Sequence, residues 1–535
     1  MANLFERLGF SDNPFATYVA ENEPQIEQYF VRPPYFDEVS TAGGACRSII
    51  LFGARGAGKS ATRMAFYKDT WSRWQTEGKA PLAVVLDDYS RIAPKAGLDV
   101  DLGAFVLEVG YLTIEAILLW LAALEDNDRA DILGSLTSDE EALVIGLVQR
   151  FYLSRSELVR SATAREPLKL LNQAWHKRTK LWVEKRWDAV GSLISTTAAA
   201  LAHKVTGETI AVESGLRELI KADNAQFSEG LFARALLGKF AECAKIFGFS
   251  GVVVLVDKVD ESLHTSNSAA ATAKLLHPLL STTQLLEVEN FGWLFFLWDK
   301  VLESYSSDLA IRLDKISHAN IKWEERYLKS MVSARLTHFS NKQLNDFQSL
   351  CEPDFDGDAA LNEVIGLCMK SPRELIRVLS TVAREHDEKF GAQADAPLLV
   401  RDSVDAALDK YAAETLPRLF NKSHLQQLIR LDLAVFTNRE VQGAFRINDQ
   451  SARAKIKAWE DAGMVAKTGT RQNNAEQGGK PANEYSVVDQ RICRVLDRHV
   501  SLGPEYDTAP GDTDSDGAAE ASPSEFHNIG ESTGK

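Results

Sequence analysis

The segment Gly53–Ser60 constrains the fold of this chain more than any other feature. It reads GARGAGKS and fits the phosphate-binding pattern G-x-x-x-x-G-K-[ST] at every fixed position. The apolar run Ser48–Phe52 before it is typical of a buried strand, and the run Ser60–Phe66 after it is typical of the start of a helix. A strand, a glycine-rich loop and a helix in this order predict an α/β domain that binds a nucleoside triphosphate.

The residue types in this loop suit a polyphosphate. Small glycines allow successive backbone N–H groups to point inward at phosphate oxygens. Lys59 is then expected to reach the β- and γ-phosphates, and the hydroxyl of Ser60 to be a ligand for Mg²⁺. The predicted phosphate contacts are Gly53, Ala54, Arg55, Gly56, Ala57, Gly58, Lys59, Ser60 and Ala61.

The composition is that of a soluble globular protein, since 45% of the residues are hydrophobic and 25% are charged. The length of 535 residues suggests three or four domains. No apolar stretch is expected to approach the roughly 18 residues of a membrane span, and the N-terminus lacks the apolar core of a signal peptide. We therefore expect a cytoplasmic protein without membrane contact. Five scattered cysteines indicate neither a metal site nor a disulfide framework, and the net charge of −15 argues against non-specific coating of nucleic acid.

Continuous apolar runs predict the strands of one parallel sheet, because strands buried on both faces lack the alternation of half-exposed ones. The phosphate-binding loop follows the first strand, and a cluster of acids follows the third. Four such runs are 48–52, 81–86, 251–256 and 292–297, and a fifth strand is predicted at 319–323.

The segment from about residue 100 to 248 is predicted to be helical throughout, and we interpret it as an insertion into the nucleotide domain. One part of it is rich in Lys and Arg and carries Trp175, Trp182 and Trp187. This part either contacts a partner or nucleic acid, or packs its tryptophans in a core beneath a solvated charged face.

The acids after the third strand form a second nucleotide motif. The strand ends in Asp257, and Asp260 and Glu261 follow one short turn later. In nucleotide-hydrolysing proteins of this kind a strand-end carboxylate holds Mg²⁺, and a neighbouring acid orients or deprotonates the attacking water. We expect Asp257 to serve the metal. The commonest pattern has glutamate directly after this aspartate, where this chain has Lys258, so the base stays open between Glu261, the first choice, and Asp260.

Two further residues have positions that suit contact with a γ-phosphate. Asp299 ends the fourth predicted strand and either faces the γ-phosphate or is an ordinary strand-end aspartate. Arg312 lies at the rim of the domain, ahead of the fifth strand. It either reaches the nucleotide bound by a neighbouring subunit, where a guanidinium stabilises transition-state charge, or forms a surface salt bridge with Asp308 or Asp314.

A capped helix start supplies another candidate. Ser371 suits the N-cap, Pro372 the first helical position, and Glu374 completes a capping box. Arg373 then lies in the first turn. It either points back at the γ-phosphate, as a cofactor-binding residue, or is an exposed arginine on a capped helix.

The C-terminal region predicts a compact unit with the order helix, turn, helix and two-stranded wing. The helices are expected at Thr437–Phe445 and Gln450–Ala462, and the strands at 464–468 and 484–488. In this plan the second helix enters the major groove of DNA while wing cations touch phosphates, although such units also serve as protein-contact modules. The cations of the second helix are Arg453, Lys455 and Lys457.

These motifs define the expected domain order. The expected parts are an N-terminal entry segment (1–47), a P-loop ATPase domain (48–323) with its helical insertion, a helical lid (324–415), a winged helix (416–499) and a disordered acidic tail (500–535).

The order of the motifs resembles bacterial AAA+/STAND-type P-loop ATPases, above all those related to origin-recognition and NACHT-like modules. The motif L-V-D-x-V-D-E at residues 255–261 resembles the L-D-G-L-D-E of that group. The resemblance covers residues 10 to about 495 and is weakest in the insertion. It implies an α/β P-loop fold and an ATPase with ATP and Mg²⁺ as cofactors.

The function implied is an ATPase whose nucleotide state controls its assembly, as a homo-oligomer, or its engagement of DNA or a protein partner. By analogy with the group, a role in anti-phage defence or in a mobile element is implied as well. The alternatives are an ATP-bound switch or adaptor with little hydrolysis, and a DNA-binding regulator.

Overall fold

The structure is a computed structural model that describes residues 3–23, 26–93, 100–156, 159–160, 224–307, 309, 311–393, 395–472 and 481–507. The tryptophan-rich part of the insertion, Asp308, the middle of the wing and the tail beyond residue 507 lie outside the described residues. The chain divides into two compact units, Met1–Val404 and Asp405–Lys535. Each is described by itself, and the domain boundaries expected from the sequence stay predictions.

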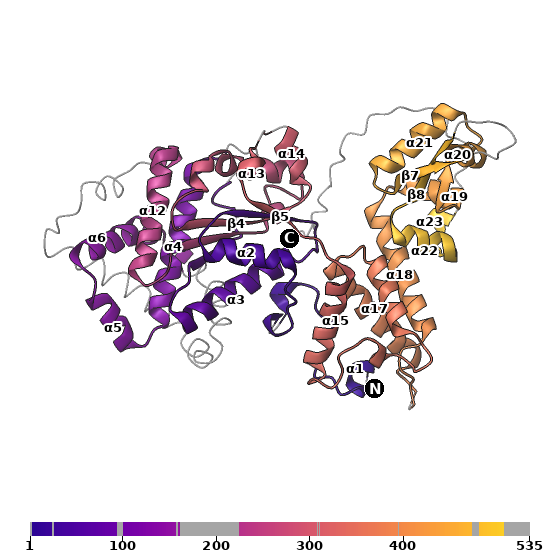
Figure 1. Ribbon diagram of the computed structural model, residues 1–535, viewed down its shortest axis with the longest axis horizontal. Coiled ribbons are helices and arrows are strands. Elements are labelled where there is room, and N and C mark those ends of the chain that lie inside the picture. Colours follow the sequence, from indigo (N-terminus) through magenta and orange to yellow (C-terminus); the bar gives the residue numbers. More distant parts are fainter. Residues whose placement is uncertain are drawn as a thin grey trace, which may run out of the picture. The chain divides into compact units, whose positions relative to one another are not determined.

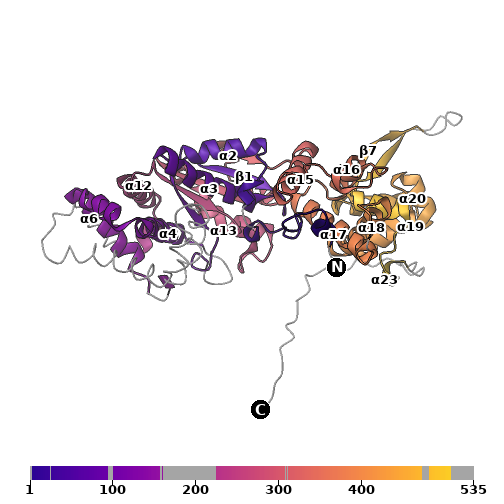
Figure 2. The same cartoon turned by 90° about the horizontal axis from the view of Figure 1, so that it is seen from below.

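A five-stranded parallel sheet forms the centre of the first unit (Figure 1). Four of the strands are almost wholly buried, as their continuous apolar runs predict, whereas the short edge strand His318–Asn320 is exposed at two of its three residues. Helices lie on both sides of the sheet (Figures 1 and 2). The predicted α/β fold with a parallel sheet is therefore confirmed. In spatial order the strands are β2 (Leu82–Leu86), β3 (Val252–Val256), β4 (Phe291–Trp298), β1 (Ile49–Gly53) and β5 (His318–Asn320).

The strand order fixes where the site lies. β1 is flanked by β4 and β5, and β4 separates it from β3. In register, Gly53 at the end of β1 pairs with Trp298, and Val256 at the end of β3 pairs with Phe295. Since the strands are parallel, the segments that follow β1, β3 and β4 all emerge at the same edge of the sheet. This edge carries the phosphate-binding loop together with the acids that follow β3 and β4.

Helix α4 corrects one expectation from the sequence. It spans Leu102–Ala123 and, among the described residues, is the one helix long and apolar enough to cross a membrane, with a mean hydropathy of 1.8. The expectation that no apolar stretch approaches such a length is therefore wrong. However, 78% of its most apolar 18-residue stretch is buried inside the protein. There α4 packs against β2, α12 (Gly230–Ile246) and the 3₁₀ turn η5 (Asn224–Ser228). Its apolar surface serves the core of the first unit.

Further described helices belong to the same part of the first unit as the sheet. One of these helices has Pro34 at its first position, where proline is well tolerated. The helices of this part are α2 (Pro34–Gly44), α3 (Lys59–Glu77), α5 (Asp126–Gly134), α6 (Ser138–Leu147), α13 (Ala269–Ser281) and α14 (Val301–Ser307), whereas the short α1 (Leu4–Arg7) contacts α17 (Pro372–Phe390).

Three helices form the remaining part of the first unit: α15 (Glu325–Phe339), α16 (Gly357–Leu367) and α17 (Pro372–Phe390). Ser371 caps α17, because its hydroxyl accepts the N–H of Glu374, and Pro372 takes the first position. The N-terminal residues pack on this part of the unit, since the N–H of Leu4 donates to Asp387 on α17. The chain therefore begins against the helices that precede the second unit.

The second unit joins helices to a three-stranded antiparallel sheet with the order β6-β8-β7. Its core is built around Trp459 and Phe436, whose rings meet edge to face. The sequence analysis missed β6, which has only three residues. The elements are α18 (Arg401–Leu419), α19 (Lys422–Leu431), β6 (Val435–Thr437), α20 (Asn438–Phe445), α21 (Asp449–Asp461), β7 (Val465–Arg471), β8 (Ala482–Val487), α22 (Gln490–Arg498) and α23 (Pro504–Asp507).

Candidate nucleotide-binding site

The loop between β1 and α3 has the backbone that its glycines predict. Gly56 and Gly58 adopt φ values of +77° and +92°, which side chains with a Cβ rarely adopt. A Cβ at Gly56 would also lie 3.0 Å from Ser371 Oγ and 3.1 Å from Arg373 Cβ. The loop is thus held against the start of α17, where the N–H of Arg373 donates to the carbonyl of Gly56. Helix α3 begins at Lys59, so its first N–H groups face the loop.

Lys59 folds back onto the loop. Its Nζ lies 2.9 Å from the carbonyl oxygen of Gly53 and 3.1 Å from that of Ala54. Burial lowers the pKa of the Lys59 ammonium below its ordinary value, although the carboxylates that follow β3 and β4 oppose this shift. Two neutral carbonyls are weak partners for a partly buried ammonium group, so the site favours an anion near Nζ.

Asp257 lies directly after β3 and is buried. Its Oδ2 accepts the hydroxyl of Ser60 at 3.0 Å and forms an ion pair with Nε of Arg63, also at 3.0 Å. Burial raises the pKa of the Asp257 carboxyl, and the Arg63 guanidinium opposes this rise. Arg63, on α3, is equally buried and lies 3.6 Å from both Asp87 and Glu21. The sequence analysis did not identify Arg63, because its partners are distant in the chain.

Lys258 occupies the position where a glutamate is commonest, and it forms an ion pair with the N-terminal segment. Its Nζ lies 3.1 Å from Oε1 of Glu21, in the 3₁₀ turn η1 (Ala20–Asn22) of the N-terminal segment. Burial alone would lower the pKa of Lys258, but the Glu21 carboxylate outweighs it and raises that pKa. The pKa of Glu21 is lowered, because a backbone hydrogen bond and the two cations outweigh its own burial. Both shifts indicate a charged pair.

Asp260 and Glu261 differ in their surroundings. Both lie in the short 3₁₀ turn η6 (Val259–Glu261) and line the same pocket. Asp260 is buried, with 5% of its surface exposed, whereas Glu261 is exposed. Oδ2 of Asp260 accepts Nε of Arg55 at 3.0 Å, and the Arg55 guanidinium lies over the ring of Trp298, 4.2 Å from its centroid. Arg55 therefore joins the loop to both β3 and β4.

Asp299 follows β4 at the same edge, and its N–H donates to the carbonyl of Gly53. Its negative charge opposes the lowering of the Lys59 pKa by burial, although Asp299 is not among the residues that line the pocket. Arg312 lies outside the pocket as well. It is exposed and donates two hydrogen bonds to the Asp314 carboxylate, both 2.8 Å long. This is the surface salt bridge that the sequence offered as the alternative to a catalytic role.

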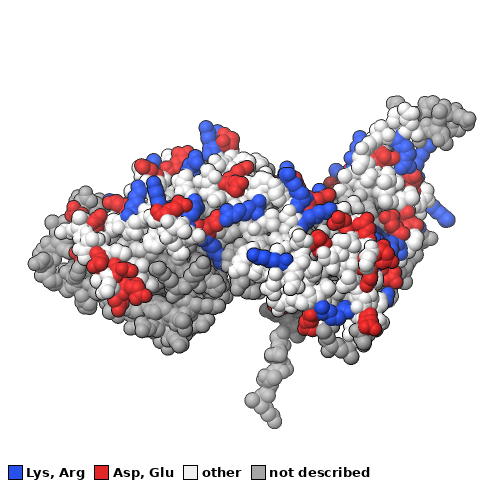
Figure 3. Space-filling view, turned by 60° about the horizontal axis from the view of Figure 1, so that its bottom comes forward, with Lys and Arg blue, Asp and Glu red and all other residues white. Residues whose placement is uncertain are grey.

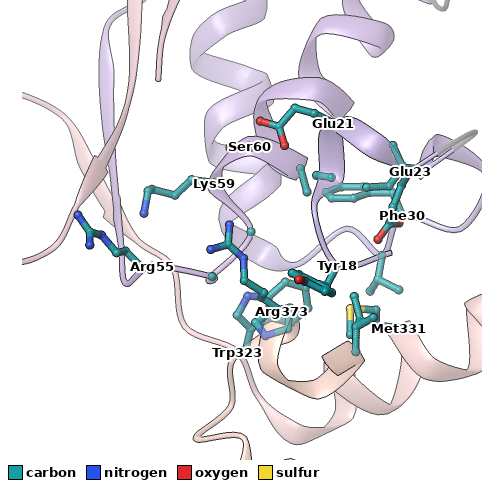
Figure 4. A pocket seen from close by; sticks show the side chains of 18 of the residues that line it. Tyr18, Glu21, Glu23, Phe30, Arg55, Lys59, Ser60, Trp323, Met331 and Arg373 are labelled. Atoms are coloured by element: carbon teal, nitrogen blue, oxygen red, sulfur yellow. The ribbon is translucent and has the colours of Figure 1, made fainter. Parts of the chain in front are cut away.

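The pocket beside the loop has a polar end and an apolar end (Figure 4). It contains about 970 Å³ of space that no atom occupies, including its open mouth. Figure 4 shows Arg373 between the loop side chains Arg55 and Lys59 and the aromatic ring of Tyr18. Tyr18, Phe30 and Met331 lie toward the apolar end in Figure 4, and the pocket is also lined by Ala20, Ile26, Val31 and Ile376. These residues come from the N-terminal segment, α15 and α17, and no sequence pattern singled them out.

Charge pairing divides the cations of this pocket into two groups. Arg55 is paired with Asp260, Lys258 with Glu21, and Arg335 on α15 with Glu23. Among the described residues that line the pocket, Lys59 and Arg373 are the cations with no carboxylate within 4 Å. Two unpaired cations thus flank the loop whose backbone suits a phosphate.

The oxygen donors of Ser60 and Asp257 lie together and suit Mg²⁺, which prefers carboxylate and hydroxyl oxygens together with those of bound phosphates. The described residues hold no cluster of three or more His, Cys, Asp or Glu side chains that would bind a metal by protein ligands alone. A metal here would accordingly share its coordination with a bound phosphate.

Comparison with known proteins finds a likeness in structure but none in sequence. No protein-family model matches the chain, and no curated protein matches it in sequence. The structure of the Aeropyrum pernix Orc1 protein in complex with DNA is similar over 93% of this chain and 96% of that chain, with 10% sequence identity and a TM-score of 0.32. The fold described above rests on the strand order and parallel pairing of this chain itself.

Proposed function

We propose that the chain is a Mg²⁺-dependent ATPase of the AAA+ type, whose nucleotide lies between the loop Gly53–Ser60 and the first turn of α17. The observation that carries the proposal is the pair of unpaired cations, Lys59 and Arg373, beside a loop with phosphate-binding backbone geometry. The apolar end of the same pocket suits the base and sugar of the nucleotide.

Lys59 and Arg373 would hold the phosphates. Lys59 needs only to rotate away from the carbonyls of Gly53 and Ala54, which are its present partners. Arg373 sits in the first turn of α17, and its backbone is already bonded to the loop at Gly56. A charge-assisted contact from α17 would then tie the helical part of the unit to the nucleotide, so that binding and release alter how α17 is held.

Ser60 and Asp257 would hold Mg²⁺, the former directly and the latter usually through water. The metal, when bound with the nucleotide, supplies charge neutralisation for the phosphates. The role of Arg63 in this arrangement is to keep the buried Asp257 carboxylate ionised and facing Ser60.

We place Asp260 ahead of Glu261 as the residue that activates water. Its carboxylate is buried against the loop, whereas Glu261 is exposed, and a base needs to lie within hydrogen-bond reach of water beside the γ-phosphate. Arg55 would orient it through the hydrogen bond between Nε and Oδ2. Asp260→Asn should bind ATP and lose turnover, while Glu261→Gln should retain most of both. The opposite pattern would assign the base to Glu261.

The test of the proposal as a whole is equilibrium binding of ATP to the full chain by calorimetry. Lys59→Ala should weaken ATP binding by at least about tenfold, because a charged contact to the phosphates is worth about 1.5–3 kcal/mol. Lys274→Ala, which removes an exposed lysine on α13, is the matched control. No measurable binding of ATP to the unmodified chain would refute the proposal. Binding without turnover would leave a nucleotide-operated switch.

We further propose that the second unit is a winged helix that contacts DNA. Its α21 presents Arg453 and Lys457 to solvent, and the hairpin of β7 and β8 carries exposed Lys467. Elsewhere acidic and basic side chains are interspersed, as the face in Figure 3 shows, so a local contact by α21 is favoured over broad coating. The test is fluorescence anisotropy of a labelled duplex with the full chain at several salt concentrations. Salt-independent binding would argue for a protein partner instead.

A further inference from the structure

The N-terminal segment that lines the pocket is held by two ion pairs, one at each side of the site. We call its described residues 18–23 and 26–31 the N-terminal strap. Glu21 of the strap pairs with Lys258 after β3, and Glu23, two residues later, pairs with Arg335 on α15. Tyr18, which precedes both acids in the sequence, and Phe30, which follows them, provide aromatic surface to the pocket. The part of the pocket that we propose to hold the nucleobase is therefore lined by a segment that ion pairs hold in place.

The Glu21 fastening is directly joined to the metal carboxylate. Oε1 of Glu21 lies 3.1 Å from Lys258 Nζ and 3.6 Å from a guanidinium nitrogen of Arg63. Arg63 in turn contacts Asp257 at 3.0 Å, and Lys258 directly follows Asp257 in the sequence. Lys258 adopts a left-handed backbone conformation, with a φ of +57°, which is uncommon for a residue with a long side chain. The left-handed turn begins at the very residue that meets the strap.

From this geometry we infer that Lys258 is a positioning residue that fastens the N-terminal strap over the nucleotide, with Glu21 as its partner and Arg63 as the link to Asp257. The inference rests on the proposed nucleotide site and deepens it. In this role Lys258, the residue after Asp257, holds the strap over the pocket. Glutamate, the commonest residue at this position, would instead activate the attacking water. The strap then joins the β3 edge to α15, because Glu23 holds its other end at Arg335.

The test is a charge-reversal cycle in the full chain, measured as the affinity and dissociation rate of a fluorescent ATP analogue. Lys258→Glu places a carboxylate against Glu21 and should raise the Kd roughly tenfold, about 1.4 kcal/mol, mainly through faster dissociation. Glu21→Lys should have a similar effect. The double variant restores an opposite-charge pair and should recover part of the affinity, because the new cation at position 21 still faces Arg63 and the new carboxylate still lies beside Asp257. Lys274→Glu, an exposed charge reversal on α13, is the control and should leave the Kd unchanged.

A second readout reports the strap itself without nucleotide. Amide hydrogen exchange of residues 18–31 should quicken in each single variant and return toward the unmodified rate in the double variant. Glu21→Gln and Lys258→Met, which remove charge without repulsion, should give smaller changes of roughly threefold in Kd and cover the case in which a reversal fails to fold.

The outcomes separate this inference from the function it rests on. If the unmodified chain binds no nucleotide, the proposed function fails. If it binds and both single reversals keep the unmodified Kd and strap exchange, the role of Lys258 is refuted. If the double variant is worse than either single variant, Glu21 and Lys258 do not act as a pair, and the inference fails likewise.

Discussion

The buried pair of Asp257 and Arg63 makes a sharp prediction about the variant most often used to disable a metal carboxylate. Asp257→Asn keeps the size of the side chain and a hydrogen-bond acceptor for Ser60, but it removes the charge beside Arg63. The two residues are only 2% and 3% exposed, so the guanidinium would be left as a buried cation. We therefore expect this substitution to destabilise the protein as well as to impair Mg²⁺-dependent nucleotide binding.

The magnitude follows from the contacts of Arg63. Removing one partner of a buried ion pair costs about 3–5 kcal/mol, mostly from the charge that is left behind. Arg63 would keep weaker contacts with Asp87 and Glu21, both at 3.6 Å, so the lower end of that range applies, about 3 kcal/mol. For a large domain this corresponds to a fall in Tm of roughly 3–6 °C.

The assay is differential scanning calorimetry without nucleotide, with Asp257→Asn compared with the double variant Asp257→Asn/Arg63→Met. Replacing both partners of a buried pair by neutral side chains is often neutral, so the double variant should recover most of the lost Tm while still failing to bind nucleotide in a Mg²⁺-dependent way. An unchanged Tm in the single variant, or equal destabilisation in both, would refute the view that Asp257 balances a buried Arg63.

Three further predictions concern other cations. Lys59→Met should abolish the rise in Tm that ATP gives and leave the nucleotide-free protein at least as stable. Because the pKa of Lys59 in the folded protein lies below 10.5, this group should add stability as the pH rises from the lowered pKa toward 10.5, and a pH series of Tm should lose that increase in the variant. Arg312→Ala should leave ATP affinity unchanged but lower turnover by about 10³ if subunits share a site, and mixing with Lys59→Ala subunits should restore part of it; no recovery in mixed assemblies would confine Arg312 to its own chain. Lys457→Ala should weaken DNA binding and lower the salt slope by roughly one, whereas Arg471→Ala should do less, because Glu440 and Glu484 already engage Arg471.

The sequence predicted the parts of the site that local rules govern. The loop after β1 needs glycine where φ is positive, so Gly56 and Gly58 are visible in the pattern itself. The strands are visible because both of their faces are buried, and Asp257 is visible as the polar residue that ends such a strand. The parallel order then brings these features to one edge, although the sequence does not state which strands are neighbours.

The residues that the sequence did not reveal have partners that lie far away in the chain. Arg63 looks like any polar residue of an amphipathic helix until Asp257, almost 200 positions later, is placed against it. The N-terminal segment carries no motif, and its place in the pocket depends on pairing with Lys258 and α15. Arg312 shows the converse: its position suggested a catalytic role, while within one chain it is exposed and paired with Asp314.

Lys258 shows how charge balance can explain a departure from a common pattern. Among the described residues that line the pocket, three cations are paired with acids, and the other two, Lys59 and Arg373, are the ones that we propose to bind the phosphates. A glutamate at position 258 would leave Glu21 facing another carboxylate and would add negative charge beside Asp257, where a polyanion is expected to bind. The acid that we propose to activate water lies instead in the turn that follows, where Asp260 accepts a hydrogen bond from Arg55. Restoring the commoner residue should therefore weaken the site, because the surrounding charges are arranged for lysine.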